Sequence, residues 1–408
     1  MFRVFVLSLL VAAASATDDS QLPTRDQNQQ NLINALKLNQ DQIKSADEGE
    51  QASPEHLAYE AKLGLPMDKI SCKGLFVEKN RIKFTLYSMP SQNITWDASQ
   101  NVKITPYFDP ELPTQILISS RLQSEKAFQP AELAFTYGIR GNKMNVISVN
   151  WDDYANCFYL QNVIGTVPEL ATIVSDMIKN TLVGMNGMDY DKLRLTGFGF
   201  GAHIAGLAAR KLPKKPARIT ALDPSGLLFS LLGENYRLKK GDAKFIDVIM
   251  TNRGVFGMQQ LVGDINFLPS GGRIQKACEN KTLIQKNTCS HRLALEYYIE
   301  SANKATHGFV AKPATSWTDF LAQKTFVEHS EIMGEAVSQK YTGNYYLEVN
   351  AQRPYSRGVN GAYLFTKASV DPYQKGPQNT VYSQNELPSQ KPKSPIAELQ
   401  SQAELSQQ

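Results

Sequence analysis

Three glycines spaced two residues apart form the segment of this chain with the clearest chemical content. Gly197, Gly199 and Gly201 separate an apolar run at residues 193–196 from an alanine-rich stretch that begins at residue 202. A sharp turn of this kind between a strand and a helix presents a nucleophilic serine at its centre, with glycines on either side. Here the central residue is Gly199, so the turn has the frame of a nucleophile site and no hydroxyl.

Two further residues supply the acid and the histidine of a possible triad. Asp223 stands at the end of an apolar run, and His291 comes directly after Cys289-Ser290. The order nucleophile, acid, histidine is that of the α/β-hydrolase triad. A dinucleotide-binding loop is the alternative for the glycines, but its G-x-G-x-x-G frame needs glycine where Ala202 stands. Removing the nucleophile of such a triad costs about 10⁶-fold in rate.

Alternating strand and helix patterns surround these residues. Apolar runs predict strands at residues 115–118, 146–151, 193–196, 219–222 and 245–250, and helical spacing predicts helices near 163–182 and 202–212. This alternation is typical of a mostly parallel central sheet with helices on both faces. We therefore expect one large α/β domain, with the α/β-hydrolase fold, over residues 66–370.

Several segments resemble the animal neutral lipases, the family of pancreatic lipase and the phospholipases A1. The resembling segments are residues 145–154, the glycine turn, 222–224, 242–249, 263–272 and Cys278 to His291. The resemblance covers about residues 70–350 and implies the α/β-hydrolase fold. It makes Gly199 the replacement of the catalytic serine and Asp223 and His291 the triad remnants. It also places Phe200 and Arg121 at the oxyanion-hole positions.

The departures from that family concern catalysis. The family's H-G-aromatic motif reads Ser119-Ser120-Arg121 here, and its D-V-I-H-T motif carries Met250 in place of histidine. Loss of the loop glycine predicts an altered loop backbone. Glycine at the turn relieves the strain that any Cβ would feel there. We predict that the chain does not hydrolyse lipid by the usual route, and that Asp223 and His291 now satisfy each other by a hydrogen bond.

The first residues and the cysteines indicate export. Residues 1–16 have the layout of a signal peptide, with cleavage expected after Ala16, so we predict a secreted, extracellular protein. Four cysteines suggest two disulfides with three possible pairings. Cys278 and Cys289 are close in sequence and are expected to close a small loop, which leaves Cys72 with Cys157; the resemblance implies the same pairs. The sequons at Asn93 and Asn280 are candidate glycosylation sites.

The two ends of the chain have a different composition. Residues 17–65 are rich in glutamine, and residues 371–408 in proline, glutamine and serine, so both are predicted to be mostly disordered. No apolar run after residue 16 is long enough for a transmembrane segment. With a net charge of +4 and scattered Lys and Arg, no nucleic-acid partner is expected. The cysteine spacing does not favour a zinc site, and no cofactor is expected.

Three functions remain open at this point. The first is an inactive lipase homologue that binds lipid or another apolar ligand, as a carrier or as a yolk-type storage protein. The chain resembles the yolk proteins of higher flies in the lost serine and in residues 343–350. It departs from them by keeping Cys278, Cys289 and His291. The second is an active triacylglycerol lipase or phospholipase A1 with an atypical mechanism. The third is an extracellular structural or partner-binding protein.

Overall fold

The computed structural model describes residues 76–363 except 89–91, 122–124, 140–142, 156–161, 227, 231–232, 304–307 and 325–328. The predicted signal peptide, the segments 17–65 and 371–408, both predicted ends of the domain and the Cys72–Cys157 pair lie outside these residues. Within the described part, no helix is long and apolar enough to cross a membrane.

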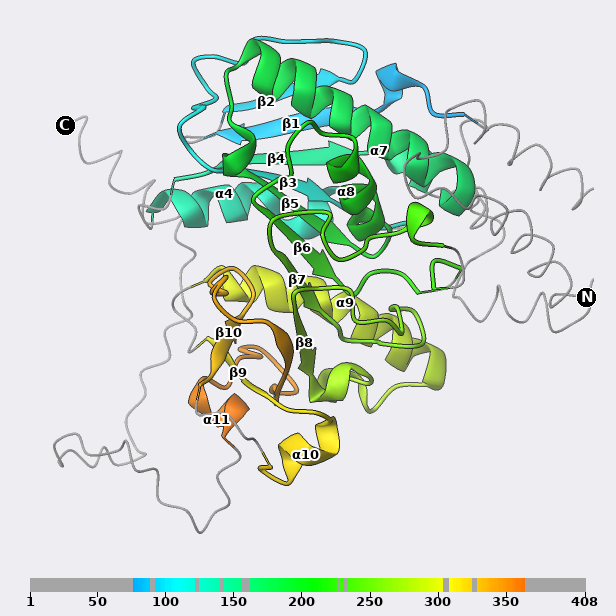
Figure 1. Ribbon diagram of the computed structural model, residues 1–408, viewed down its shortest axis with the longest axis vertical. Helices are drawn as coiled ribbons and strands as arrows, with labels where there is room; N and C mark the ends of the chain where they lie inside the picture. Colours follow the sequence, from blue (N-terminus) through cyan, green and yellow to red (C-terminus); the bar gives the residue numbers. More distant parts are fainter. Residues whose placement is uncertain are drawn as a thin grey trace, which may run out of the picture. The chain divides into compact units, whose positions relative to one another are not determined.

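One sheet runs through the described part of the chain (Figure 1). Its strands, in the order β10-β9-β11-β8-β7-β6-β5-β3-β4-β1-β2, are β1 (Lys83–Ser88), β2 (Gln92–Asp97), β3 (Thr114–Ile118), β4 (Asn145–Asn150), β5 (Leu193–Phe198), β6 (Arg218–Leu222), β7 (Ile246–Ile249), β8 (Ile265–Pro269), β9 (Phe309–Pro313), β10 (Glu331–Met333) and β11 (Gly343–Leu347).

The centre of the sheet is parallel and its margins are antiparallel. Neighbouring strands from β4 through β3, β5, β6, β7 and β8 to β11 all pair in parallel. The margins β1–β2 and β9–β10 join the sheet in antiparallel fashion. The prediction of a mostly parallel sheet is confirmed, and β3 to β7 coincide with the five predicted strands to within two residues.

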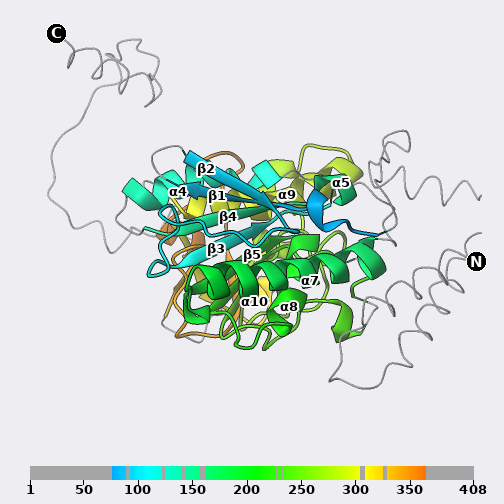
Figure 2. The same ribbon diagram turned by 90° about the horizontal axis from the view of Figure 1, so that it is seen from above.

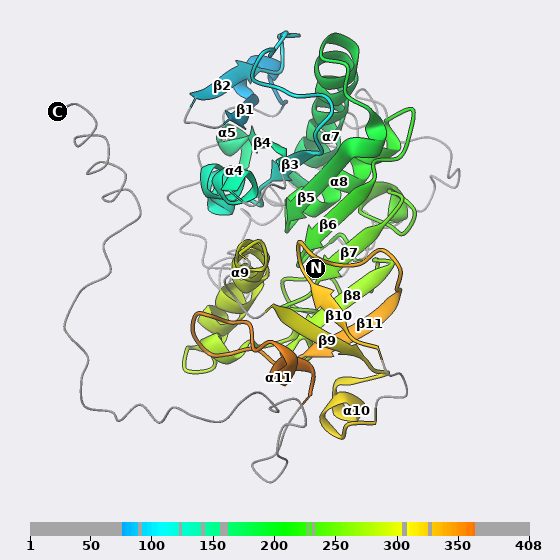
Figure 3. The same cartoon turned by 90° about the vertical axis from the view of Figure 1, so that its left-hand side faces the viewer.

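Helices cover both faces, as expected (Figures 2 and 3). The helices α7 (Val167–Asp176) and α8 (Phe200–Arg210) lie on one face, and α4 (Pro130–Ile139) and α9 (Leu283–Ser301) on the other. The shorter helices are α5 (Asp152–Ala155), α10 (Trp317–Leu321) and α11 (Val359–Ala362). The fold thus has three layers, with the sheet in the middle.

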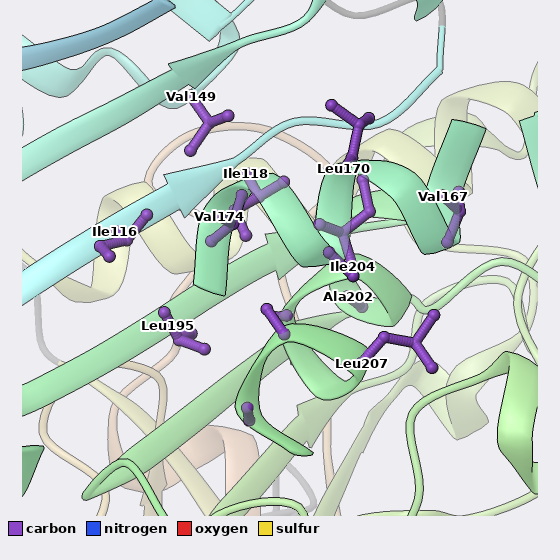
Figure 4. Packing of buried hydrophobic residues seen from close by; sticks show 14 of the residues in the cluster. Ile116, Ile118, Val149, Val167, Leu170, Val174, Leu195, Ala202, Ile204 and Leu207 are labelled. Carbon is purple, nitrogen blue, oxygen red and sulfur yellow. The ribbon is translucent and has the colours of Figure 1, made fainter. Parts of the chain in front are cut away.

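The alternation of side chains along β3 shows how the two helical layers pack against the sheet. Ile116 and Ile118 belong to the apolar cluster that includes α7 and α8, whereas Leu117 between them belongs to the cluster that includes α9. Figure 4 shows Ile116, Ile118 and Leu195 beside residues of α7 and α8. All five residues of β3 are buried, as expected for a strand at the centre of a sheet with both faces covered.

The first predicted long helix is wound in three parts. α7 is flanked by wider π-helical segments at Asn162–Thr166 and Met177–Met185, so helical winding extends from residue 162 to 185. Apolar spacing in the sequence predicts the helix but does not separate a π turn from an α turn.

Candidate active site

Gly199 forms the tight turn between β5 and α8. Its φ of 54° and ψ of −110° lie in a region that residues with a Cβ rarely adopt. The turn is tied to β6, because the Gly199 N–H donates to the Leu222 carbonyl at 3.0 Å. The Gly199 carbonyl accepts from the Ser225 N–H at 3.2 Å. The backbone therefore has the form of a nucleophile elbow, held in place without a nucleophile.

The flanking glycines are required by packing alone. A Cβ at Gly201 would lie 2.7 Å from the carbonyl carbon of Ile118 and 2.8 Å from the carbonyl oxygen of Ser119. A Cβ at Gly197 would press on the backbone of Gly201. β3, β5 and the start of α8 approach one another too closely for side chains at these two positions.

The acid and the base of the triad order meet in space. Asp223 follows β6, is fully buried, and its Oδ2 lies 2.6 Å from His291 Nδ1. Its Oδ1 accepts the N–H groups of Thr251 at 2.9 Å and Asn252 at 3.0 Å. This arrangement orients the imidazole with Nδ1–H toward the carboxylate.

His291 sits in an apolar setting with a partly open side. Its ring lies 4.7 Å from that of Phe198 and 5.9 Å from that of Phe256, measured between centroids. Its side chain keeps 17% of its exposure, whereas the side chain of Asp223 has none. The base is therefore accessible to a small group, and the carboxylate behind it is not.

Ser120 enters the site from the loop after β3. It follows β3, it is buried, and its Oγ accepts the N–H of Phe200 at 3.2 Å. A Cβ at position 199 would lie 2.9 Å from the Cβ of Ser120 and closer still to its Oγ. The hydroxymethyl group of Ser120 thus occupies the space into which a side chain at 199 would project.

The predicted oxyanion-hole positions are close to this serine. The N–H of Phe200 is engaged by Ser120, and Arg121, the next residue along the loop, is buried. Ser120 is not among the described non-glycine residues with positive φ, so the loop holds a side chain there without a left-handed backbone. Met250, which directly follows β7, is fully buried.

Sequence reasoning did not single out Ser120 or Ser225 as site residues. The Oγ of Ser225 would lie 3.2 Å from a Cβ at position 199, so its hydroxyl also borders the vacant position. The replacement of the loop glycine by Ser120 was the available signal for the first. No pattern in the sequence marks the second, because its place depends on the turn after β6.

His203, on α8, supports the turn from its buried side. Its Nδ1 accepts the Leu238 N–H at 3.2 Å, and Nε2 therefore donates to the Ser225 carbonyl at 2.8 Å. The ring stacks on Phe229 with centroids 3.9 Å apart. Burial lowers the pKa of His203 to about 3, so the ring stays neutral.

The disulfide expected beside His291 is present. Cys278 and Cys289 are bonded across 11 residues, which ties the start of α9 to the segment before it. The prediction of this pair is confirmed. The side chains of both sequon asparagines, Asn93 in β2 and Asn280 ahead of α9, are exposed.

The parallel sheet, the turn at 199 and the Asp223–His291 pair define an α/β-hydrolase fold. A family model described as Lipase matches residues 70–355, and the chain belongs to the lipase family. The expected family membership and fold are thereby confirmed.

Two curated relatives each match less than half of the chain. Mouse lipase member H is 32% identical over 181 residues, which are 44% of this chain and 39% of the relative. Human pancreatic lipase-related protein 2 is 31% identical over 206 residues, 45% of this chain and 43% of the relative. Among solved structures, a CIB-like hydrolase from Thermoplasma acidophilum covers 55% of this chain and 96% of its own, with 12% identity and a TM-score of 0.29. The chain spans about two fifths of the length of these curated relatives.

Proposed function

We propose that this chain is a secreted lipase-family protein that binds lipid or another apolar ligand without hydrolysing it. The observation that carries the proposal is Gly199 at the centre of an otherwise complete elbow. Acyl transfer in this fold needs a nucleophilic side chain at that position, and its removal costs about 10⁶-fold in rate. What remains near the site, the Asp223–His291 pair, has no covalent step to assist there.

The residual catalysis that such sites retain comes from the oxyanion hole and substrate binding. Here the Phe200 N–H already has Ser120 Oγ as its acceptor at 3.2 Å. A substrate carbonyl would have to displace that hydroxyl. The geometry therefore favours binding over turnover.

The proposed ligand class follows from family membership and from the walls of the site. Phe198 and Phe256 flank His291 with apolar rings, which suit an acyl chain more than a polar metabolite. A carrier or yolk-type storage role would use the same capacity, with the fold kept and the chemistry lost.

Secretion is supported by the Cys278–Cys289 disulfide, since such bonds persist mainly in oxidising compartments. The exposed side chains of Asn93 and Asn280 are open to N-glycosylation in that route. A mobility shift on enzymatic deglycosylation of the protein from culture medium, absent in the Asn93→Gln/Asn280→Gln variant, checks both points.

Two assays on the purified, full-length protein test the proposed function. Lipids are extracted and identified by mass spectrometry, and hydrolysis of a short-chain ester and of a phospholipid is measured beside a His291→Ala control. We expect a co-purified or rebinding lipid and no hydrolysis that His291→Ala removes. Hydrolysis abolished by that substitution, or a failure to bind any fatty acid, lysolipid or triacylglycerol probe, contradicts the proposal.

The second candidate is hydrolysis by an atypical mechanism, and one observation favours it. The Asp223–His291 hydrogen bond has the geometry of a general base with its orienting carboxylate. Such a pair would activate water or a neighbouring hydroxyl. The same His291→Ala comparison separates this function from ligand binding.

A further inference from the structure

Positions 120 and 199 cannot both carry a side chain in this backbone. The Cβ atoms would be 2.9 Å apart, a separation that real Cβ contacts essentially never show, and the Oγ of Ser120 would be closer still. Neither position can easily move away from the other. Ser120 is buried, and the backbone at Gly199 is hydrogen-bonded to Leu222 of β6. The hydroxymethyl group that this fold carries on the elbow is here attached to the facing loop.

The hydroxyl of Ser120 also takes up a donor that the chemistry needs. The N–H of the residue after the nucleophile is one of the two oxyanion-hole donors, and here that residue is Phe200. Its N–H donates to Ser120 Oγ at 3.2 Å. A carbonyl oxygen entering the hole would compete with this bond in a buried space.

We propose that the chain retains a latent acyl-transfer site which the Ser120 side chain holds shut, and that residues 120 and 199 together decide whether the site is catalytic. This rests on the proposed absence of hydrolysis in the natural chain. Three further parts of such a site are present: the elbow backbone, the Asp223–His291 pair at 2.6 Å, and a partly exposed imidazole. A serine at 199 alone is insufficient, because Ser120 displaces its side chain and blocks the hole.

The covalent step that the opened site would perform is the ordinary one. The hydroxyl that Gly199→Ser introduces attacks an ester carbonyl while its proton passes to His291 Nε2. The imidazolium then protonates the leaving alcohol, and water releases the acid by the same two steps. With a fluorophosphonate probe the new bond is oxygen to phosphorus, and fluoride leaves.

The test compares Gly199→Ser, Ser120→Gly and the Ser120→Gly/Gly199→Ser double variant by fluorophosphonate labelling and ester hydrolysis. Loss of one oxyanion donor costs about 10²- to 10³-fold. We therefore expect the double variant to react about 100-fold faster than Gly199→Ser, with labelling at position 199 that His291→Ala abolishes. Ser120→Ala should give an intermediate rate, since it removes the Oγ and leaves the Cβ.

The matched control is Ser119→Gly/Gly199→Ser. It removes the neighbouring serine side chain and adds the same backbone freedom, but no atom of Ser119 is among those nearest to a Cβ at position 199. It should react no faster than Gly199→Ser. Equal rates for the single and double variants, or a gain in the Ser119 control, overturn the proposal.

A second measurement covers the case in which a variant is poorly folded. Urea unfolding midpoints of the natural chain, Gly199→Ala, Ser120→Gly and their combination form a double-mutant cycle. If the two side chains exclude each other, Gly199→Ala lowers the midpoint less when residue 120 is glycine. Additive changes in the midpoint contradict the proposal that Ser120 holds the site shut. A folded Ser120→Gly/Gly199→Ser variant that does not react contradicts it as well. Hydrolysis by the natural chain instead contradicts the proposed function. The double-mutant cycle still tests whether the side chains at 120 and 199 exclude each other.

Discussion

Oδ2 of Asp223 lies 2.6 Å from Nδ1 of His291, although residue 199 offers no hydroxyl for the pair to activate. The carboxylate has further partners, because its Oδ1 accepts two backbone N–H groups of the loop after β7. Loss of the Asp223 side chain therefore leaves two buried N–H groups without their acceptor, whereas loss of the His291 side chain leaves these two bonds intact.

Asp223→Ala is expected to destabilise the fold more than His291→Ala, by at least about 2 kcal/mol. Each buried N–H left without an acceptor costs about 1–3 kcal/mol, and the loss of Asp223 leaves those of Thr251 and Asn252. Urea unfolding of both variants checks this. Asp223→Asn retains an acceptor oxygen and should fall between them; equal losses for the two alanine variants would mean that the backbone bonds contribute little.

Gly199→Ala should cost more stability than Gly187→Ala. Both glycines have positive φ, 54° and 74°, but a Cβ at 187 meets no atom within 4 Å, whereas a Cβ at 199 meets Ser120. The backbone cost of a positive φ is about 1–3 kcal/mol, and overpacking adds about 1–3 kcal/mol at 199 alone. Thermal and urea unfolding of the pair measure the difference, and similar losses at the two positions would argue against the contact.

Removing the disulfide by Cys278→Ser/Cys289→Ser should lower the free energy of unfolding by about 3 kcal/mol. The bond closes a loop of 11 residues, and the estimate is the chain entropy that the unfolded state regains. Unfolding midpoints of the natural and doubly substituted proteins, with and without a reducing agent, provide the measurement. If the reducing agent breaks the bond in the natural protein and the unfolding midpoint does not change, the predicted stabilisation is wrong.

His203 is expected to make the fold acid-sensitive. Its folded pKa of about 3 lies below its ordinary 6.5, so the unfolded chain binds a proton first as the pH falls, and stability is lost between pH 6.5 and 3. By pH 4.5 this amounts to about 3 kcal/mol. Asp242 acts in the opposite sense, because burial raises its pKa to about 6 and its contribution to stability is lost as the pH rises through that value.

The comparison of the natural chain with His203→Gln isolates the histidine, since Asp242 is common to both. At pH 7 the natural chain should be the more stable, and its advantage should shrink by about 3 kcal/mol between pH 7 and pH 4.5. A constant difference across that range would show that His203 takes up a proton in the folded state as readily as in the unfolded one.

The glycine turn and the periodicity of the strands were readable because they are local. The predicted central strands and the Cys278–Cys289 pair followed from patterns within short windows, and the structure confirms them. Glycines 197 and 201 marked the turn because strand, loop and helix backbones meet there, whatever chemistry the turn serves. The glycine frame therefore predicts architecture, and the residue at its centre predicts chemistry.

What the sequence could not supply is the contact between loops far apart along the chain. Ser120 and Gly199 meet only because β3 and β5 are neighbours in the sheet, and the direction of the Ser120 side chain depends on that pairing. The antiparallel margins β1–β2 and β9–β10 were also not foreseen, since short strands at a sheet edge carry little periodic signal. Nor does apolar spacing separate the π turns beside α7 from α-helix.

The exclusion between positions 120 and 199 also orders the steps by which such a chain can change over generations. With Ser120 in place, a serine arriving at 199 meets an occupied space, so the proposed gain in turnover is small and selection for hydrolysis has little to favour. With serine first at 199, a serine arriving at 120 meets the same obstruction. A change from serine at 120 to serine at 199, or the reverse, passes through a chain with glycine at both positions. The loss of the nucleophile is therefore not undone by a single substitution.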